Sequence, residues 1–301
     1  MRIATFLILV VGFLPGAAQA QVELTLSAPP AGFVLGEPVV LRATMRNTSP
    51  EPAASPRFLK PEFGIVQYYV GSEPDASSLF VPYLLKEPAE PTVQLEPGGE
   101  ILEDVEIFYG ADGWFFRSPG QYQVRAVVPG GSLQSNTVNF SILPPQSPEE
   151  ETAAEAIINS DQAGRFLLFR GGEHLDEGRE VLERVMELAP NSPLSDHAGV
   201  SLGLNWLRPA ADWSAGEVRA ANPSRALDLL SVVDIDTVGI ERGGAALLGQ
   251  AEAHRLLQDN AAADRLKDQA PDILKRVFPE LDMNTWQNRI APQINRDLKI
   301  E

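Results

Sequence analysis

The chain contains no cysteine, and this absence removes several kinds of chemistry at once. No disulfide can staple the fold, no thiolate can act as a nucleophile, and no lipid can be attached through sulfur near the N-terminus. Without disulfides, the fold depends on buried apolar area and on hydrogen bonds. With 301 residues and 44% apolar side chains, the chain is long enough and apolar enough to form two domains with cores of their own.

Positive charge is also scarce. The chain has 24 lysines and arginines against 41 aspartates and glutamates, which gives a formal net charge of −17. A surface this acidic repels nucleic-acid phosphates and anionic lipids. We therefore expect no nucleic-acid partner, and the charge favours a basic segment in any protein partner.

Long apolar runs are missing after the first twenty residues. The run at residues 3–14 is shorter than the ~20 residues that a membrane-spanning helix needs. Arg2 precedes the run and small residues at 18–20 follow it, which is typical of a signal peptide at 1–20 that is cleaved near Ala20. We expect a mature protein that is periplasmic or secreted and has no membrane span; an uncleaved N-terminal anchor is the alternative.

Residues 21–144 show the two-residue period of β-strands. Segments such as "VELTLSA" and "SLFVPYLL" read as short strands, and proline or glycine clusters lie between nearly all of them. In one strand the alternation places four apolar residues on the same face: Val39, Leu41, Ala43 and Met45. Roughly seven or eight such strands predict an antiparallel β-sandwich.

Two segments of this half carry a family resemblance. "GEPVVLRATMRNTS" and, much later, "SPGQYQVRAVVPGGSLQSNTVNFSIL" resemble the first and last parts of bacterial immunoglobulin-like domains. The resemblance covers about 120 residues and implies an immunoglobulin-like sandwich in which the hydroxyl of Tyr122 binds a loop backbone. Because animal domains of this kind usually carry a cysteine pair, the absence of cysteine favours a bacterial source.

The pattern changes at residues 145–151, which we predict to be a short linker. Ser147 can cap a helix that has Pro148 at its first position, and Glu150 completes a capping-box spacing. Apolar residues then recur at three- and four-residue intervals, so residues 152–301 are predicted to form an all-α domain.

The segment "EGREVLERVMELAPNSPLSDHAGVSLGLNWL" resembles a degenerate tetratricopeptide-like unit. The turn "APNSP" and small residues such as Ala198 and Gly199 match the places where helices of that family turn and touch. A fainter second copy follows Gly244. The resemblance implies helical hairpins that bind other proteins; a plain small helical bundle is the alternative.

Two of the three histidines, His174 and His197, lie among carboxylates and raise the question of a metal or acid/base site. They sit near the starts of two successive helices, and a 14-residue helix separates its ends by about 20 Å, so the pair cannot share one ion. We expect Asp176 to cap the first helix, Asp196 to lie in the first turn of the second, and both histidines to be half exposed. No metal, cofactor or catalytic residue is predicted.

Other patterns with chemical meaning are weak. The chain has no Gly-x-Ser-x-Gly segment and no glycine-rich phosphate loop. Asp104 and Glu106 share one face of a predicted strand, which could serve glycoside hydrolysis or calcium binding, but a solvated sheet face is the favoured interpretation.

Aromatic side chains of the sandwich offer a candidate ligand platform, formed by Tyr69, Trp114 and Phe116. Adjacent aromatics in "YYV" and "GWFF" must point to opposite sides of a strand, so some face outward. They could stack on sugar rings, but packing against the helical half is the favoured interpretation.

These observations favour a non-catalytic, exported protein of the bacterial envelope that binds or scaffolds another envelope or secreted protein. The first alternative is an accessory module that binds polysaccharide through the sandwich aromatics. A hydrolase is the third.

Overall fold

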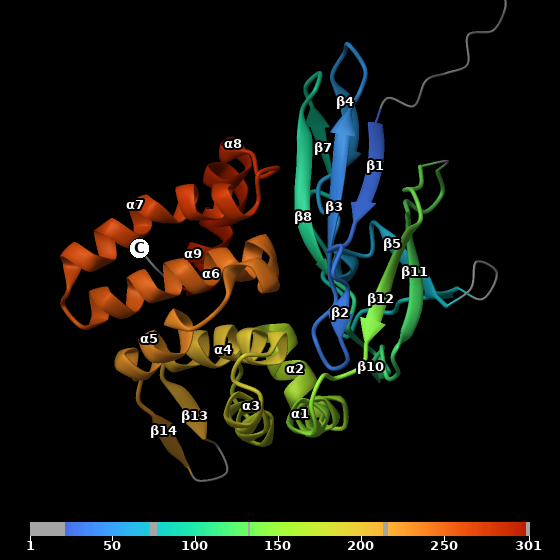
Figure 1. Cartoon of the computed structure of the whole chain (residues 1–301). Helices are drawn as coiled ribbons and strands as arrows, with labels where there is room; N and C mark the ends of the chain where they lie inside the picture. Colours follow the sequence, from blue (N-terminus) through green and yellow to red (C-terminus); the bar gives the residue numbers. More distant parts are fainter. Residues whose placement is uncertain (1–21, 73–76, 132, 213–215, 299–301) are drawn as a thin grey trace, which may run out of the picture.

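The computed structural model describes residues 22–72, 77–131, 133–212 and 216–298, so the predicted signal peptide at 1–20 lies outside the described residues. Strands fill the first half of the described chain and helices dominate the second (Figure 1). This is the predicted order of a β half and a helical half. None of the described helices combines the length and the apolar character needed to cross a membrane.

The β half contains two main sheets and two short ladders. Its elements are β1 (Val22–Ser27), β2 (Phe33–Val34), β3 (Val40–Asn47), β4 (Ala53–Pro56), the 3-10 turn η1 (Pro61–Phe63), β5 (Gln67–Gly71), β6 (Ser78–Leu79), β7 (Thr92–Leu95), β8 (Glu100–Glu106), β9 (Tyr109–Gly110), β10 (Gly113–Trp114), β11 (Gly120–Val127) and β12 (Val138–Leu143). The sheets have the orders β1-β3-β8 and β2-β12-β11-β5-β6, and the ladders are β4-β7 and β9-β10. Because β2 pairs with β12 in parallel, the prediction of a wholly antiparallel arrangement is wrong for this pair.

Side chains from both main sheets form one hydrophobic core. Leu41 and Met45 of β3 meet Val124 of β11 and Phe140 of β12 in this cluster. The predicted apolar face of this strand is confirmed, since Val39, Leu41, Ala43 and Met45 are all fully buried. Alternation alone was sufficient for this prediction because a strand exposes every second side chain to the same environment.

The helical half follows without a break. Its elements are α1 (Pro148–Ile158), α2 (Asp161–Phe169), α3 (Asp176–Leu188), α4 (Pro193–Trp206), the hairpin β13 (Ala210–Asp212) and β14 (Glu217–Arg219), α5 (Pro223–Ser231), α6 (Ile235–Leu256), α7 (Asn260–Val277), α8 (Met283–Thr285), the π-helical η3 (Trp286–Ile290) and α9 (Ala291–Leu298). Successive helices pack against each other, as in α3 with α4 and α6 with α7.

Local capping signals set several helix starts. The side chain of Ser147 accepts from the N–H of Glu150, as predicted, and α1 begins at Pro148 inside the predicted linker. The carboxylate of Glu150 accepts from Gln146 instead of Ser147. Ser192 caps α4. The cap of α3 is Leu175, so the prediction of Asp176 as the cap is wrong by one position.

The β half shares its core with the first helices of the helical half. Ala153 and Ile157 of α1 and Phe166 of α2 belong to the same buried cluster as the sheet side chains. Gly164 of α2 lies against the ring of Tyr109, so closely that a Cβ there would be 2.3 Å from two ring atoms. Such an approach is open only to glycine, and it fixes α2 against the β half.

Replacing Gly164 with valine should lower the free energy of unfolding by about 1–3 kcal/mol, because the buried ring of Tyr109 cannot move away. Gly120→Val is the matched control: a Cβ at Gly120 lies 3.8 Å from the nearest atom, and valine suits a strand. Urea denaturation of both variants measures the effect. Equal stability of the two would contradict the close packing of α2 on β9.

Candidate functional site

One face of β8 turns toward the helices instead of toward water. Asp104 is 4% exposed and the side chain of Glu106 is 14% exposed. The predicted solvated sheet face is therefore wrong for this pair. The start of α6 covers the face, and Leu102 from the same side of β8 joins the apolar cluster of the helical half.

Helix α6 is interrupted at Gly239, which lets strand and helix approach each other. Gly239 has φ 83° and ψ 172°, and a Cβ there would lie 3.0 Å from Oδ2 of Asp104. The backbone N–H of Glu241 donates to this oxygen at 2.8 Å. Asp104 therefore caps the restarted helix, where the unpaired N–H groups favour a negative charge.

Glu106 is held by two arginines. Nε and Nη2 of Arg242 donate to its two carboxylate oxygens at 3.0 and 3.3 Å, and Nη2 of Arg170 donates at 3.2 Å. Burial alone would raise the pKa of Glu106, but Arg242 and Arg170 outweigh burial and lower the pKa to about 2. The carboxylate is therefore ionised and paired at neutral pH, so it has no proton to donate.

Further ion pairs surround this contact. Nζ of Lys60 lies 2.5 Å from Oε2 of Glu241, and Nη2 of Arg170 lies 3.6 Å from the same oxygen. Glu103 accepts from Nη2 of Arg289 at 3.1 Å. Four cations and four carboxylates from the two halves thus form what we call the junction network: Lys60, Arg170, Arg242, Arg289, Glu103, Asp104, Glu106 and Glu241.

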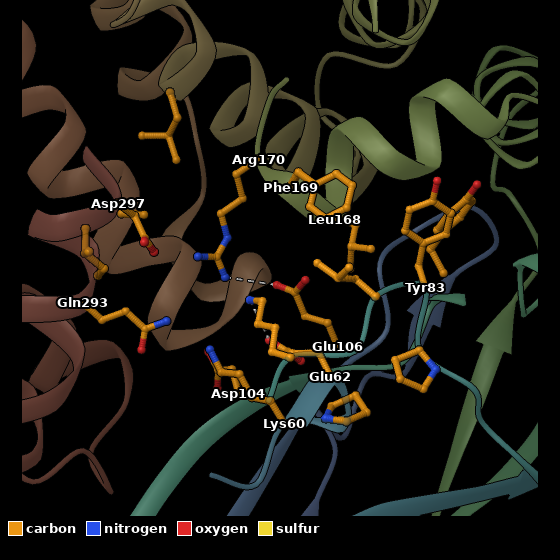
Figure 2. Close-up of a pocket in the computed structure, with 18 of the residues that line it drawn as sticks. Lys60, Glu62, Tyr83, Asp104, Glu106, Leu168, Phe169, Arg170, Gln293 and Asp297 are labelled. Atoms are coloured by element: carbon orange, nitrogen blue, oxygen red, sulfur yellow. Dashed lines mark hydrogen bonds and ion pairs between the residues drawn. The ribbon is translucent and has the colours of Figure 1, made fainter. Parts of the chain in front are cut away.

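A cavity of about 320 Å³ lies beside the junction network, between the β half and the helices. Its apolar lining includes Phe80, Tyr83, Leu84, Leu168 and Phe169, and its polar lining includes Arg208, Gln293 and Asp297. Figure 2 shows Arg170 in the space between Gln293 and Asp297 on one side and Leu168 and Tyr83 on the other. A cavity with one polar and one apolar side suits an amphiphilic ligand.

Exposed apolar side chains lie in the lining of this cavity, as Tyr83, Leu84 and Phe169 do, and next to these residues in the sequence. We call them the apolar strip: Leu79, Val81, Tyr83, Leu84, Leu85 and Phe169, which are 40–67% exposed. The rings of Tyr83 and Phe169 lie 5.9 Å apart, so the strip joins the β half to the end of α2. Exposed apolar side chains that are clustered in this way are uncommon on a protein surface that has no partner.

The sequence pattern did not reveal the strip. "SLFVPYLL" was predicted to be a strand, but β6 includes only Ser78 and Leu79 of it. Two features of the sequence argue against a regular strand here. The seven residues 79–85 are all apolar and do not alternate with polar ones, and Pro82 cannot donate a hydrogen bond to a neighbouring strand. Only Phe80 turns inward, to 2% exposure, so the others are left at the surface.

The two histidines have different surroundings. His174 is exposed and has a positive φ of 62°. His197 is 1% exposed, so the prediction of half exposure is wrong for His197. Asp196 lies in the first turn of α4, as predicted, and accepts from Thr237 at the start of α6. In the described ranges, no group of three or more His, Asp or Glu side chains could hold a metal ion.

His197 faces Glu37, a residue of the β half that the sequence pattern did not single out. Nε2 of His197 lies 3.8 Å from Oε1 of Glu37, and Oε2 of Glu37 accepts from the N–H of Val34 at 2.7 Å. Burial raises the pKa of Glu37 to about 8 and lowers the pKa of His197 well below its usual value. Both side chains are therefore uncharged at neutral pH.

Two of the three side chains of the candidate ligand platform are buried. Trp114 is 3% and Phe116 2% exposed, so neither presents a ring face to a ligand. The ring of Trp114 packs 5.1 Å from that of Phe108, and β10 packs against α2. Tyr69 is half-buried beside Arg125. The prediction of a ligand platform is therefore wrong for Trp114 and Phe116, because the core and the helical half cover these two side chains.

No protein-family model and no curated protein matches the chain. Among solved structures, it is similar to a β-glucosidase from Erythrobacter marinus (19% identity, 40% of this chain and 15% of that chain, TM-score 0.26). It is also similar to a β-glucosidase from Listeria innocua in complex with glucose (20% identity, 40% and 16%, TM-score 0.25). A third is the alkylpurine DNA glycosylase AlkC of Pseudomonas fluorescens, bound to DNA containing an abasic site analog (21% identity, 42% and 31%, TM-score 0.26). The chain spans less than a third of each, and scores this low carry no argument about function.

Replacing Glu106 with glutamine should lower the free energy of unfolding at pH 7 by about 3–5 kcal/mol, because Arg242 loses its buried counter-ion. Since the folded pKa is depressed, this contribution is present above the ordinary pKa of 4.5 and is lost as the pH falls toward 2. Urea denaturation measures it. Glu187→Gln, which breaks a surface pair with Arg184, should cost less than about 1 kcal/mol, and a similar loss in both variants would refute the assignment.

Replacing Glu37 with glutamine should flatten the pH dependence of stability. The folded pKa of Glu37 is raised from 4.5 to about 8, so its contribution is complete below pH 4.5 and is lost as the pH rises through 8. Between pH 5 and 8 the free energy of unfolding of the wild type should fall by about 2–4 kcal/mol through this group, and that of the neutral variant should not. Urea denaturation at both pH values, with exposed Glu87→Gln as control, tests this; an unchanged slope in Glu37→Gln would contradict it.

Proposed function

We propose that this chain is an exported protein of the bacterial envelope, periplasmic or secreted, that binds or scaffolds another protein and does not catalyse a reaction. The observation that carries the proposal is the apolar strip beside the cavity. Of the eleven exposed large hydrophobic residues in the described part of the chain, five lie between residues 79 and 85. On a chain with a net charge of −17, such a concentration supports a binding surface.

The contacts of the two carboxylates favour binding over a hydrolase, although burial raises the pKa of Asp104 to about 6. Glu106 is ionised between two arginines, and Asp104 is occupied as the cap of α6. A glycoside hydrolase needs one protonated carboxylic acid and a second carboxylate on either side of the substrate. Two arginines compensate the charge of Glu106, and Asp104 accepts a hydrogen bond from the backbone of α6. The two carboxylates are therefore better suited to holding the two halves together than to hydrolysing a glycoside.

We further propose that the β half is an immunoglobulin-like domain. In that family one sheet contains the first, second and fifth main strands and the other contains the third, sixth and seventh. The orders β1-β3-β8 and β12-β11-β5 agree with this distribution. The hydroxyl of Tyr122 also donates to the carbonyl of Ser118 at 3.0 Å, which is the loop contact that the resemblance implies.

For the helical half we propose tetratricopeptide-like hairpins. The turn after Ala189 joins α3 to α4, and glycines on α4 allow the next helix to approach closely. A Cβ at Gly199 would lie 3.1 Å from the carbonyl of Leu229, and one at Gly203 would lie 2.5 Å from Leu230. Small residues at helix contacts are what this family uses, although a plain bundle would use them in the same way.

A polysaccharide remains the second candidate ligand, with a different platform from the one predicted. Tyr83 and Phe169 are exposed at the cavity, close to the polar side chains of Gln293 and Asp297. Aromatic faces beside carboxylates and amides suit sugar rings. We favour a protein because the apolar strip extends beyond the cavity-lining residues, through Leu79, Val81 and Leu85.

The double variant Leu84→Asp, Leu85→Asp should reduce capture of the partner from an envelope extract at least about tenfold, because it places two charges in the apolar strip. Capture by immobilised protein, followed by gel densitometry, measures this. Val218→Asp, at a side chain that is 70% exposed on β14, is the matched control and should capture normally.

Digestion of the extract with protease distinguishes the two ligand classes. Loss of the captured material supports a protein partner, and its persistence supports a polysaccharide. Equal capture by wild type and by the double variant would contradict the strip as the binding surface.

A further inference from the structure

Two arginines that line the cavity, Arg170 and Arg208, are not fully hydrogen-bonded within the described chain. Nε of Arg170 and Nε of Arg208 are both buried without an acceptor among the described residues. Arg208 donates to the backbone carbonyl of Asp297, and no described carboxylate lies within 4.0 Å of it. A guanidinium presents donors in a planar fork that fits a carboxylate.

Arg170 contacts two carboxylates, Glu106 at 3.2 Å and Glu241 at 3.6 Å, and each of these has another cation beside it. Glu106 receives two hydrogen bonds from Arg242, at 3.0 and 3.3 Å, and Glu241 pairs with Lys60. The polar side of the cavity therefore has cationic donors available, while Asp297 and Glu62 nearby disfavour additional acidic groups. Arginine donors beside other carboxylates favour a ligand that carries one carboxylate and disfavour a ligand with several acidic groups.

The opposite side of the cavity requires an apolar group. Tyr83, Leu168 and Phe169 face the space into which Arg170 reaches (Figure 2). A cavity of about 320 Å³ lies at the lower end of the ~300–1,000 Å³ range of ligand pockets, so it has room for a small group only. The ligand part inside the cavity thus carries a carboxylate at one end and a compact apolar group at the other.

The apolar strip indicates that the ligand continues outside. Leu85 packs over Gly64 next to the cavity-lining turn η1, and Leu79 and Val81 extend the strip in the other direction. A free small molecule would leave this exposed surface uncovered. A polypeptide that ends in the cavity would cover it with the residues that precede its terminus.

We infer that the cavity receives the C-terminal residue of the partner chain, an inference that rests on the proposed binding function. The terminal carboxylate binds Arg170 and Arg208, and the terminal apolar side chain packs against Tyr83 and Phe169. The preceding residues, apolar or basic, lie along the apolar strip.

An array of peptides immobilised through their N-termini tests this inference. It contains every combination of the last two residues, each made both as a free acid and as a carboxamide. We expect wild-type protein to bind free acids with an apolar last residue at least about tenfold more tightly than the matching amides. Arg208→Gln should remove this difference, and Arg184→Gln, at an exposed arginine of α3, should keep it. Unchanged urea midpoints establish that both variants are folded.

Equal binding of acids and amides, or a preference that survives Arg208→Gln, would overturn the inference. If no peptide binds while capture from extract still depends on Leu84 and Leu85, the proposed function stands and the terminal carboxylate is excluded. If 4-phenylbutyrate binds as tightly as the best peptide, the cavity is a small-molecule site and the inference fails.

Discussion

The contact between β8 and the start of α6 is the interaction on which the rest of the structure depends. Glu106 is ionised beneath two arginines, and Asp104 caps the helix that restarts after Gly239. Removing such groups from water costs several kcal/mol each, and the cost is offset only while every charge keeps its partner. Because the partners come from both halves, the network stabilises one relative position of the β half and the helices and opposes any sliding between them.

The cavity depends on the relative position of the β half and the helices, which the junction network stabilises. Its lining comes from the loop after β6, from β8, from the end of α2 and from α9, so neither half contains the site alone. Arg170 connects the two functions of the region: one of its nitrogens belongs to the junction network, and its Nε remains without an acceptor among the described residues. Arg170 is the residue at which α2 ends, and its backbone is left-handed (φ 54°).

Features set by neighbours in the sequence could be predicted, and features set by distant residues could not. The buried face of β3 and the caps Ser147 and Ser192 follow from alternation and from short-range hydrogen bonds. Asp104, by contrast, bonds to a residue 137 positions later, and His197 is buried against a loop of the other half. The period of a strand shows that two side chains share a face but not what covers that face. Tertiary contacts therefore overturned the predictions of a solvated sheet face and of a half-exposed His197.

The exposure of the aromatic residues also depends on contacts with distant residues, which the sequence pattern does not show. Trp114 and Phe116 looked like a platform because they adjoin other aromatics, yet the core has room for them and the helices cover them. Tyr83 stays outside because Phe80 takes the inward position of its segment and Pro82 prevents continuation of the strand. Apolar side chains are usually buried, and exposing a run of them to water costs free energy. The apolar strip departs from this rule beside a cavity that two arginines line, and binding of a ligand there would offset the cost. A ligand that covers the strip would supply the offsetting free energy, and for this reason we propose a function at the junction and not on either half.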